Sequence, residues 1–357
     1  MVRDEPHVFL ASLGHTRCRP RYRHFPMQRL LPKLLLSGSG GPGVTDPPSA
    51  GGCQELVNVT AVVPAFNRIG KCIDTLSKIY NCVPRPAEVI VHVDGNRQEY
   101  AKEIKNAFPE TKVLGSVDRL GPGGSRNKMI EAASCNLVAS FDDDSYPLDC
   151  DYFQKVAQVA DALADASIIS ATLYHPGEEI EPPTSAIVRV ADFPGCACIY
   201  RRDRFQEFGG YLPIVVPYGI EEVDLALRYC SRGALIYRAG CLRVFHNNDR
   251  SEHADAGITA ASIANIALLA FLRYPVICWP IGMWQVMRRL IWLIKVGRIA
   301  GIFQGMTKIP VELLKFRQHR TVLPTSAILS YLRLRRSFAV NRDESRDIST
   351  ADRGRAP

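Results

Sequence analysis

The chain has 357 residues, 46% hydrophobic and 22% charged, so it is long enough and apolar enough to bury a sizeable core. Its net charge of +8 is uneven: residues 1–52 and 273–357 are basic, whereas residues 53–272 hold twenty-one Lys or Arg and twenty-eight Asp or Glu. An acidic central region argues against a nucleic-acid-binding core, and a basic tail favours contact with an anionic surface. Eleven cysteines without a CxxC motif argue against a structural zinc site and a disulfide framework.

Composition divides the chain into four parts. Residues 1–57 are rich in Arg, Pro and Gly and are expected to be an extension without fixed structure; the alternative is a mis-called start, with translation beginning at a later residue such as Met27. Residues 58–272 are expected to form one catalytic domain. Residues 273–337 are expected to form a helical tail, and residues 338–357 a disordered end.

The central region alternates strand and helix patterns. In its first half, strands are expected at 59–64, 88–93, 112–114 and 136–141, and helices at 69–80, 98–108 and 125–133. In its second half, strands are expected at 167–173, 186–190, 196–200, 235–237 and 243–245, and helices at 203–208 and 218–233. This alternation predicts right-handed βαβ crossovers and an α/β fold with a mainly parallel, Rossmann-like sheet.

Three consecutive carboxylates, Asp142, Asp143 and Asp144, directly follow a predicted buried strand. On an extended segment alternate side chains share a face, so Asp142 and Asp144 can converge on a divalent cation such as Mg²⁺ or Mn²⁺. The alternative is a solvated acidic turn, or an N-cap for a helix that begins near residue 151. Asn67 and Asp94 also follow predicted strands, so all five residues are expected at one rim of the sheet, where ligands bind in such folds.

Seven motifs occur in order between about Val59 and Tyr274. They are Val63–Arg68, Val93–Gly95, Leu120–Asn127, Asp142–Asp144, Arg201–Phe205 with Phe208–Tyr211, Glu221–Leu225 with Arg228, and His246. Each motif is weak alone, but the ordered set resembles the family 2 glycosyltransferases, which are inverting enzymes with the nucleotide-binding type-A fold. The resemblance covers most of the expected catalytic domain.

The resemblance implies a donor site for a nucleoside-diphosphate sugar. Asp94 would accept hydrogen bonds from the nucleobase, and the segment 64–68 would wrap the nucleoside. The glycine-rich loop 121–124 would bring backbone amides close to phosphate or ribose, with Arg126 nearby. The implied donor-binding residues are Pro64, Phe66, Asn67, Arg68, Asp94, Gly121, Arg126, Asp142 and Asp143.

The resemblance also implies a metal site and a catalytic base. Asp142 and Asp144 would form the DxD pair; Asp144 and His246 would be metal ligands, and Asp142 would contact the metal or the ribose. Mixed imidazole and carboxylate ligation favours Mn²⁺, and Mg²⁺ stays open. Glu221-Glu222 resembles the acidic base motif, although the family usually has Asp where this chain has the longer Glu222. The alternative for this acidic pair is favourable placement at a helix N-terminus.

These roles predict an enzyme that moves a sugar to a hydroxyl of a glycan or lipid-linked glycan, in cell-surface polysaccharide synthesis. Glu222 would remove the acceptor proton, and the acceptor oxygen would attack the anomeric carbon from the face opposite the nucleotide, inverting its configuration. Two alternatives stay open: a polyprenyl-phosphate glycosyltransferase of the same fold, and a catalytically silent scaffold that binds sugar nucleotides.

The tail carries all three tryptophans, Trp279, Trp284 and Trp292. The apolar segment after residue 274 meets Arg288-Arg289 before it reaches the ~20 residues that a membrane span needs. One helix over 281–303, with its charges on one half of the circumference, would lie on an anionic inner leaflet. The chain is therefore expected to be cytoplasmic and peripheral on the plasma membrane; the alternative is a helical cap on the catalytic body.

Overall fold

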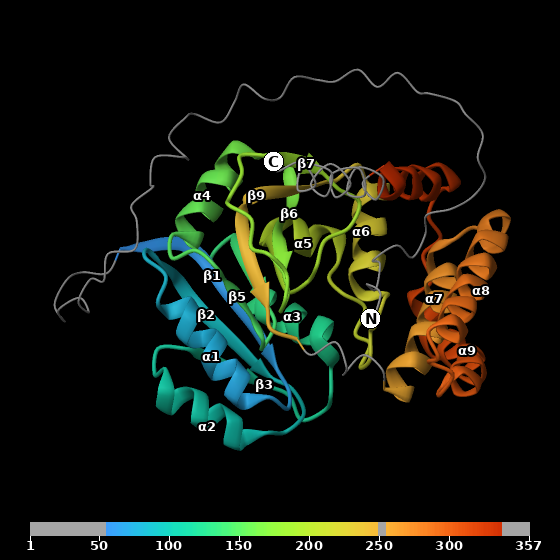
Figure 1. The fold of residues 1–357 in the computed structure, drawn as a ribbon, viewed down its shortest axis with the longest axis horizontal. Coiled ribbons are helices and arrows are strands. Elements are labelled where there is room, and N and C mark those ends of the chain that lie inside the picture. Colours follow the sequence, from blue (N-terminus) through green and yellow to red (C-terminus); the bar gives the residue numbers. More distant parts are fainter. Residues whose placement is uncertain (1–54, 249–254, 338–357) are drawn as a thin grey trace, which may run out of the picture.

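A computed structural model describes residues 55–248 and 255–337 of the chain. Most of the extension expected at 1–57, and all of the end expected at 338–357, lie outside the described residues. Within the described part, one mixed sheet with flanking helices forms the main body, and a group of helices from the C-terminal region lies beside it (Figure 1). The predicted α/β class is confirmed.

The first half of the sheet is a parallel βαβ arrangement, as predicted. Its elements are β1 (Leu56–Ala65), α1 (Ile69–Tyr80), β2 (Arg85–Val93), α2 (Gln98–Ala107), β3 (Lys112–Gly115), α3 (Gly121–Ala132) and β4 (Leu137–Phe141). β1 pairs in parallel with both β2 and β4, and β2 pairs in parallel with β3. The carboxyl ends of these strands therefore meet at one rim.

The second half of the sheet is mixed. Its elements are β5 (Ser145–Pro147), α4 (Tyr152–Ala162), β6 (Ala166–Tyr174), β7 (Ile187–Arg189), β8 (Ala197–Arg201), α5 (Arg202–Phe208), α6 (Glu221–Ser231) and β9 (Leu235–His246). The strand order is β3-β2-β1-β4-β8-β6-β9-β5, with β7 on β9. β8 runs antiparallel to both β4 and β6, so the start of β8 lies beside the end of β4.

The strand β5 was not predicted, and two predicted features of the sheet domain take another form. The expected glycine loop 121–124 is the first turn of α3, because the Asp94 carboxylate accepts hydrogen bonds from the backbone N–H groups of Leu120 (2.8 Å) and Gly121 (3.0 Å). The two short strands expected at 235–237 and 243–245 form the single strand β9, because Ala239 between them pairs with β7.

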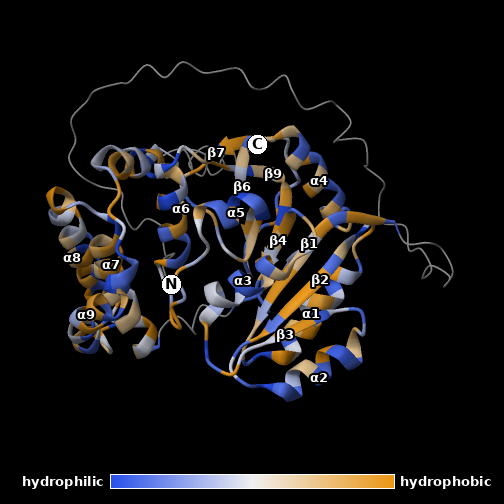
Figure 2. Cartoon of the chain, turned by 180° about the vertical axis from the view of Figure 1, so that it is seen from behind, coloured by the Kyte–Doolittle hydropathy of each residue, from blue (hydrophilic) through white to orange (hydrophobic). Residues whose placement is uncertain are grey.

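Hydrophobic cores lie on both faces of the sheet. Along β1, Val62 belongs to the core that includes α3 and α6, whereas Ala61 and Val63 belong to the core that includes α1 and α4. This alternation follows from the two-residue period of a strand. The central strands are hydrophobic over most of their length because both of their faces are covered (Figure 2).

The tail comprises α7 (Ala256–Arg273), a short 3₁₀ turn (Val276–Cys278), α8 (Trp279–Lys295), α9 (Ile302–Phe316), a second 3₁₀ turn (Arg317–His319) and a helix over residues 325–337. The prediction of one helix over 281–303 is wrong: Gly297 and Gly301 have φ of +75° and +88° and separate α8 from α9. Arg289, expected among the outward charges, is buried.

One helix of the described residues, α7, is long and apolar enough to cross a membrane. However, 72% of its most apolar window is buried, and α7 packs against both α8 and α9. Its composition therefore fits a core helix of the tail.

Candidate active site

The acidic loop begins where β4 ends and is tied to the β1–α1 connection through Arg68. Arg68 Nε donates to Asp143 Oδ2 at 3.2 Å, and its Nη1 donates to Asp144 Oδ2 at 2.7 Å. Burial raises the pKa of Asp143 to about 6, and Arg68 opposes that rise. Arg68 therefore holds Asp143 and Asp144 together, whereas Asp142 pairs with Arg126, because residues 143–144 form a turn and not the extended segment that the sequence predicted.

Asp144 faces His246 across the β5–β9 pair, in which Ser145 lies opposite His246. The Asp144 Oδ1 to His246 Nε2 distance is 3.1 Å, an ion-pair contact without hydrogen-bond geometry, so a buried carboxylate oxygen is left without a hydrogen-bond partner. Burial alone would raise the pKa of Asp144, but His246, Arg68 and Lys71 hold it below its usual range.

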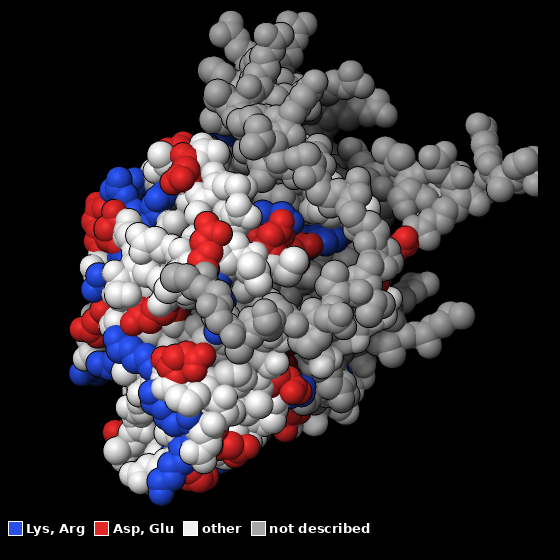
Figure 3. Space-filling model, turned by 90° about the vertical axis from the view of Figure 1, so that its left-hand side faces the viewer, with Lys and Arg blue, Asp and Glu red and all other residues white. Residues whose placement is uncertain are grey.

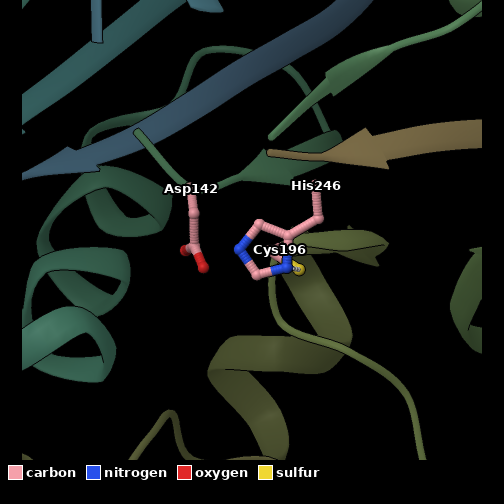
Figure 4. Close-up of side chains that lie close together, drawn as sticks. All are labelled: Asp142, Cys196 and His246. Carbon is pink, nitrogen blue, oxygen red and sulfur yellow. Dashed lines mark hydrogen bonds between the residues drawn. The ribbon is translucent and has the colours of Figure 1, made fainter. Parts of the chain in front are cut away.

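A cluster of potential metal ligands includes one residue that the sequence analysis missed. Ligand atoms of Asp142, Cys196 and His246 all lie within 4.8 Å of one another (Figure 4). Cys196 Sγ is 3.9 Å from His246 Nδ1. Only the antiparallel pairing of β8 with β4 brings Cys196 to this place, and nothing in the spacing of the cysteines indicated it.

Carboxylate and imidazole donors, with one buried carboxylate oxygen free of hydrogen bonds, fit a divalent cation such as Mn²⁺. The metal ligands expected from sequence, Asp142, Asp144 and His246, are therefore brought together. Their occupancy by a metal is a proposal that rests on this donor set.

Arg126 lies at the centre of the site and is almost fully buried. Its Nε donates to Ser140 Oγ at 3.0 Å, its Nη2 donates to Asp142, and its Nη1 donates to Glu221 Oε1 at 3.4 Å. One guanidinium thus joins the acidic loop to α6. The sequence analysis placed Arg126 near the phosphates of the donor; the structure shows it paired with two protein carboxylates.

The acidic pair begins α6, and its two members differ in their surroundings. Glu221 is buried against Arg126, and burial raises its pKa to about 8, opposed by Arg126. Glu222 is less buried, and its Oε1 accepts a hydrogen bond from the Gly195 N–H at 3.2 Å. Burial also raises the pKa of Glu222.

The residues expected to bind the nucleoside lie at the ends of β1 and β2. Asp94 accepts hydrogen bonds from Ser116 Oγ (3.1 Å) and from two backbone N–H groups of the α3 start, so both of its oxygens have protein partners. The guanidinium carbons of Arg119 and Arg97 lie 3.9 Å and 4.8 Å from the centre of the Phe66 ring.

Pro64 is half-buried near the end of β1, and Asn67 is exposed in the loop that follows it. β1 and β2 pair in parallel up to Ala65 and Val93, so these residues and Asp94 lie at the same rim. Their roles in donor binding stay predictions.

A mixed α/β sheet with a cluster of carboxylates, an imidazole and an acidic helix start at its rim defines a type-A glycosyltransferase architecture. Residues 60–209 match the family described as "Glycosyl transferase family 2". This part of the chain is therefore similar to the family 2 glycosyltransferases, the family that the sequence motifs predicted. No curated protein matches the chain in sequence.

Two solved structures show how this chain compares in three dimensions. The first, GalNAc-T7 with UDP, GalNAc and Mn²⁺, has a TM-score of 0.49 and 12% identity, over 61% of this chain and 48% of that chain. The second, the mannosyltransferase PcManGT from Pyrobaculum calidifontis in complex with GDP-Man and Mn²⁺, has a TM-score of 0.47 and 12% identity, over 79% of this chain and 87% of that chain. The chain thus spans about half the length of GalNAc-T7.

Proposed function

We propose that this protein transfers a sugar from a nucleoside-diphosphate sugar to an acceptor hydroxyl, with inversion and with the help of a divalent cation. The observation that carries the proposal is the position of Arg126, which pairs with Asp142 of the proposed metal cluster and with Glu221 of the acidic pair. The proposed metal site and the proposed base therefore lie on either side of one buried guanidinium, and a single displacement needs both near the reacting groups.

Asp142, Asp144 and His246, with the Cys196 thiol beside them, would hold the cation, which we propose to be Mn²⁺ rather than Mg²⁺ because imidazole nitrogen and thiol sulfur suit Mg²⁺ poorly. When bound, the cation would neutralise the diphosphate leaving group. Arg68 and Lys71, which pair with the acidic loop, add fixed positive charge at the same rim.

Glu222 is the residue we propose as the general base. Glu221 is paired with Arg126 and is almost inaccessible to solvent. Glu222 is less buried, and only its Oε1 accepts the hydrogen bond from the Gly195 N–H. Glu222 would take the proton from the acceptor hydroxyl while the acceptor oxygen attacks the anomeric carbon opposite the nucleotide. The extra methylene of Glu222 relative to Asp extends its reach by about one carbon–carbon bond.

We propose a glycan or lipid-linked glycan as acceptor, in cell-surface polysaccharide synthesis, with the protein peripheral on the cytoplasmic face of the plasma membrane. The basic, apolar tail supports a location at a membrane. A polyprenyl-phosphate acceptor is compatible with the same features. A catalytically silent scaffold is disfavoured because the acidic loop, the acidic pair and His246 are all retained, although a silent protein would need none of them.

Nucleotide binding tests the proposal. We expect one of UDP, GDP, dTDP and CDP to bind in calorimetry, with an affinity that rises at least about tenfold when Mn²⁺ is present. Asp144→Asn should remove this Mn²⁺ effect, and Asp161→Asn on the exposed face of α4 should keep it. If none of the four binds, with or without Mn²⁺, the transferase proposal is wrong.

A further inference from the structure

The helix α8 exposes most of its apolar side chains to solvent and buries two polar side chains against the body. Met283, Met287, Ile291 and Ile294 recur at helical spacing and are 73%, 50%, 41% and 60% exposed. The buried positions of the same helix are Gly282, Gln285, Arg289 and Leu293. A surface helix bordered by water normally shows the reverse distribution.

The inward polar residues of α8 have specific partners on α7 and its end. Arg289 Nε donates to Ser262 Oγ at 3.1 Å, and Gln285 Nε2 donates to the Tyr274 hydroxyl at 3.1 Å. The guanidinium of Arg289 also lies 4.6 Å from the centre of the Trp292 ring. These contacts define how α8 is rotated, so the apolar stripe is held outward.

The helix α9 also packs on α7 and has exposed apolar side chains of its own. Phe303, Val311 and Leu314 are 81%, 59% and 64% exposed, whereas Gly305 packs so closely on α7 that an added Cβ would lie 2.9 Å from both Ala260 O and Ile263 Cδ1. The α8–α9 connection adds Ile299, which is 66% exposed. These side chains stay largely exposed among the described residues, and a concentration of exposed apolar side chains on neighbouring helices marks an interaction surface.

Charge identifies the class of partner. Residues 273–337 contain twelve Lys or Arg and a single acid, Glu312. On the side of the molecule opposite the tail, by contrast, positive and negative side chains are interspersed (Figures 1 and 3). Two copies of so basic a segment would repel each other, whereas an anionic bilayer offers both opposite charge and an apolar interior.

We propose that the outward face of α8 and α9 is embedded in the headgroup and acyl boundary of an anionic lipid bilayer. We call it the tail face and define it by Met283, Met287, Ile291, Ile294, Phe303 and Leu314. The inference deepens the proposed membrane association, on which it rests, by naming the embedded surface and its polarity. Helices that lie in this boundary bury one apolar face and keep Lys and Arg near the headgroups.

The helix α7, on which α8 and α9 pack, is bonded to the helix that carries the proposed catalytic base. Arg273, the last residue of α7, donates from Nε and Nη2 to the buried carboxylate of Asp224 on α6, and from Nη1 to the His319 carbonyl oxygen at 2.9 Å. Asp224 lies in the same first turn of α6 as Glu221 and Glu222. Embedding of the tail face would therefore hold the acceptor side of the site at a constant distance from the lipid surface.

Vesicle flotation of the full chain tests the inference, with phosphatidylcholine vesicles that contain phosphatidylglycerol and with pure phosphatidylcholine vesicles. We expect the wild type to float with the anionic vesicles and to float less with the neutral ones. Ile294→Asp and Leu314→Asp should each weaken partitioning at least about tenfold. The matched control is Leu56→Asp: Leu56 is 59% exposed, against 60% for Ile294, and begins β1 on the far side of the body (Figure 1).

Three outcomes would overturn the inference. In the first, the wild type stays in the aqueous fraction. In the second, Leu56→Asp and Ile294→Asp weaken vesicle binding equally. In the third, light scattering shows that the wild type is a dimer and that Ile294→Asp is a monomer. Nucleotide binding with Mn²⁺, measured on the same preparations, keeps this inference separate from the proposed function. Retained nucleotide binding with absent flotation removes the tail-face inference alone, and retained flotation with absent nucleotide binding removes the proposed transferase alone.

Discussion

At the scale of single residues, Arg126 is the side chain on which the site depends most. It is 2% exposed and pairs with Asp142 and Glu221, so its removal would leave two carboxylates near the core without their cation. A buried charge that loses its partner destabilises a protein far more than a broken surface pair does.

We predict that Arg126→Ala lowers the free energy of unfolding by about 3–5 kcal/mol, as measured by urea denaturation. The control is Arg204→Ala, because Arg204 is half exposed and pairs with the exposed Glu207; we expect a loss below about 1 kcal/mol. Similar losses for the two variants would contradict the view that Arg126 compensates buried charge.

For the proposed base, we predict that Glu222→Gln lowers kcat by a factor of about 10²–10⁴ and leaves the affinity for nucleotide within about twofold. The amide keeps the size of the side chain but cannot accept the acceptor proton. Glu103→Gln, on the exposed surface of α2, should change neither quantity. Full transfer by Glu222→Gln would remove Glu222 from the mechanism.

The pH dependence of transfer follows from the same residue. Burial raises the pKa of Glu222 above its ordinary value of 4.5, and a base acts only when it is deprotonated. Transfer should therefore be present above the raised pKa and be lost as pH falls through it. We expect the acidic limb of the kcat/KM profile to lie above pH 4.5; a profile that is flat down to that pH would argue against a buried carboxylate as base.

At the scale of elements, the start of α3 is a close contact between two segments that are distant in sequence. Gly121 has φ of +74°, and a Cβ at this position would lie 2.2 Å from the carbonyl oxygen of Ile214. Only glycine adopts this left-handed backbone conformation without strain and also lacks the Cβ for which there is no room. The same glycine donates its N–H to Asp94, so α3 is held from both sides.

We predict that Gly121→Ala costs about 2–4 kcal/mol of stability, since the strain of the left-handed conformation adds to a backbone clash. Gly70→Ala in α1 should stabilise the protein by up to about 1 kcal/mol, because a Cβ there meets nothing within 4 Å and alanine favours the helix. Chemical denaturation of the two variants measures both effects. A neutral Gly121→Ala would show that the α3 start can shift away from Ile214.

At the scale of the whole molecule, the proposed metal site is assembled from three parts of the sheet. Asp142 follows β4, Cys196 precedes β8 and His246 ends β9. A ligand that binds such a site stabilises the folded state, because the unfolded chain cannot reproduce the arrangement.

We predict that Mn²⁺ with the bound nucleotide, at about 100 times its Kd, stabilises the chain by about 2.7 kcal/mol against thermal unfolding. EDTA should remove this stabilisation. His246→Ala should abolish the Mn²⁺-dependent part, whereas His319→Ala, in the second 3₁₀ turn of the tail, should retain it. Equal stabilisation of wild type and His246→Ala by Mn²⁺ would place the cation elsewhere.

The sequence by itself determined the features that depend on local pattern. The limits of α1 and the βαβ order of the first half follow from periodicity, because each element must hide its own apolar face. The acidic loop and the acidic pair were recognised because each is a run of contiguous residues. His246 was recognised by its place after the other motifs in the sequence. Family 2 motifs of this kind are short segments, so they can be recognised in the sequence without knowledge of the fold.

Only the tertiary structure decided the contacts between distant segments. Cys196 joins the metal cluster through the β4–β8 pairing, and Arg126 turns out to bridge two protein carboxylates. The outward rotation of α8 is likewise decided by the polar partners of Gln285 and Arg289 on α7 and its end. A helical pattern shows which side chains share a face, but only packing determines which face is buried.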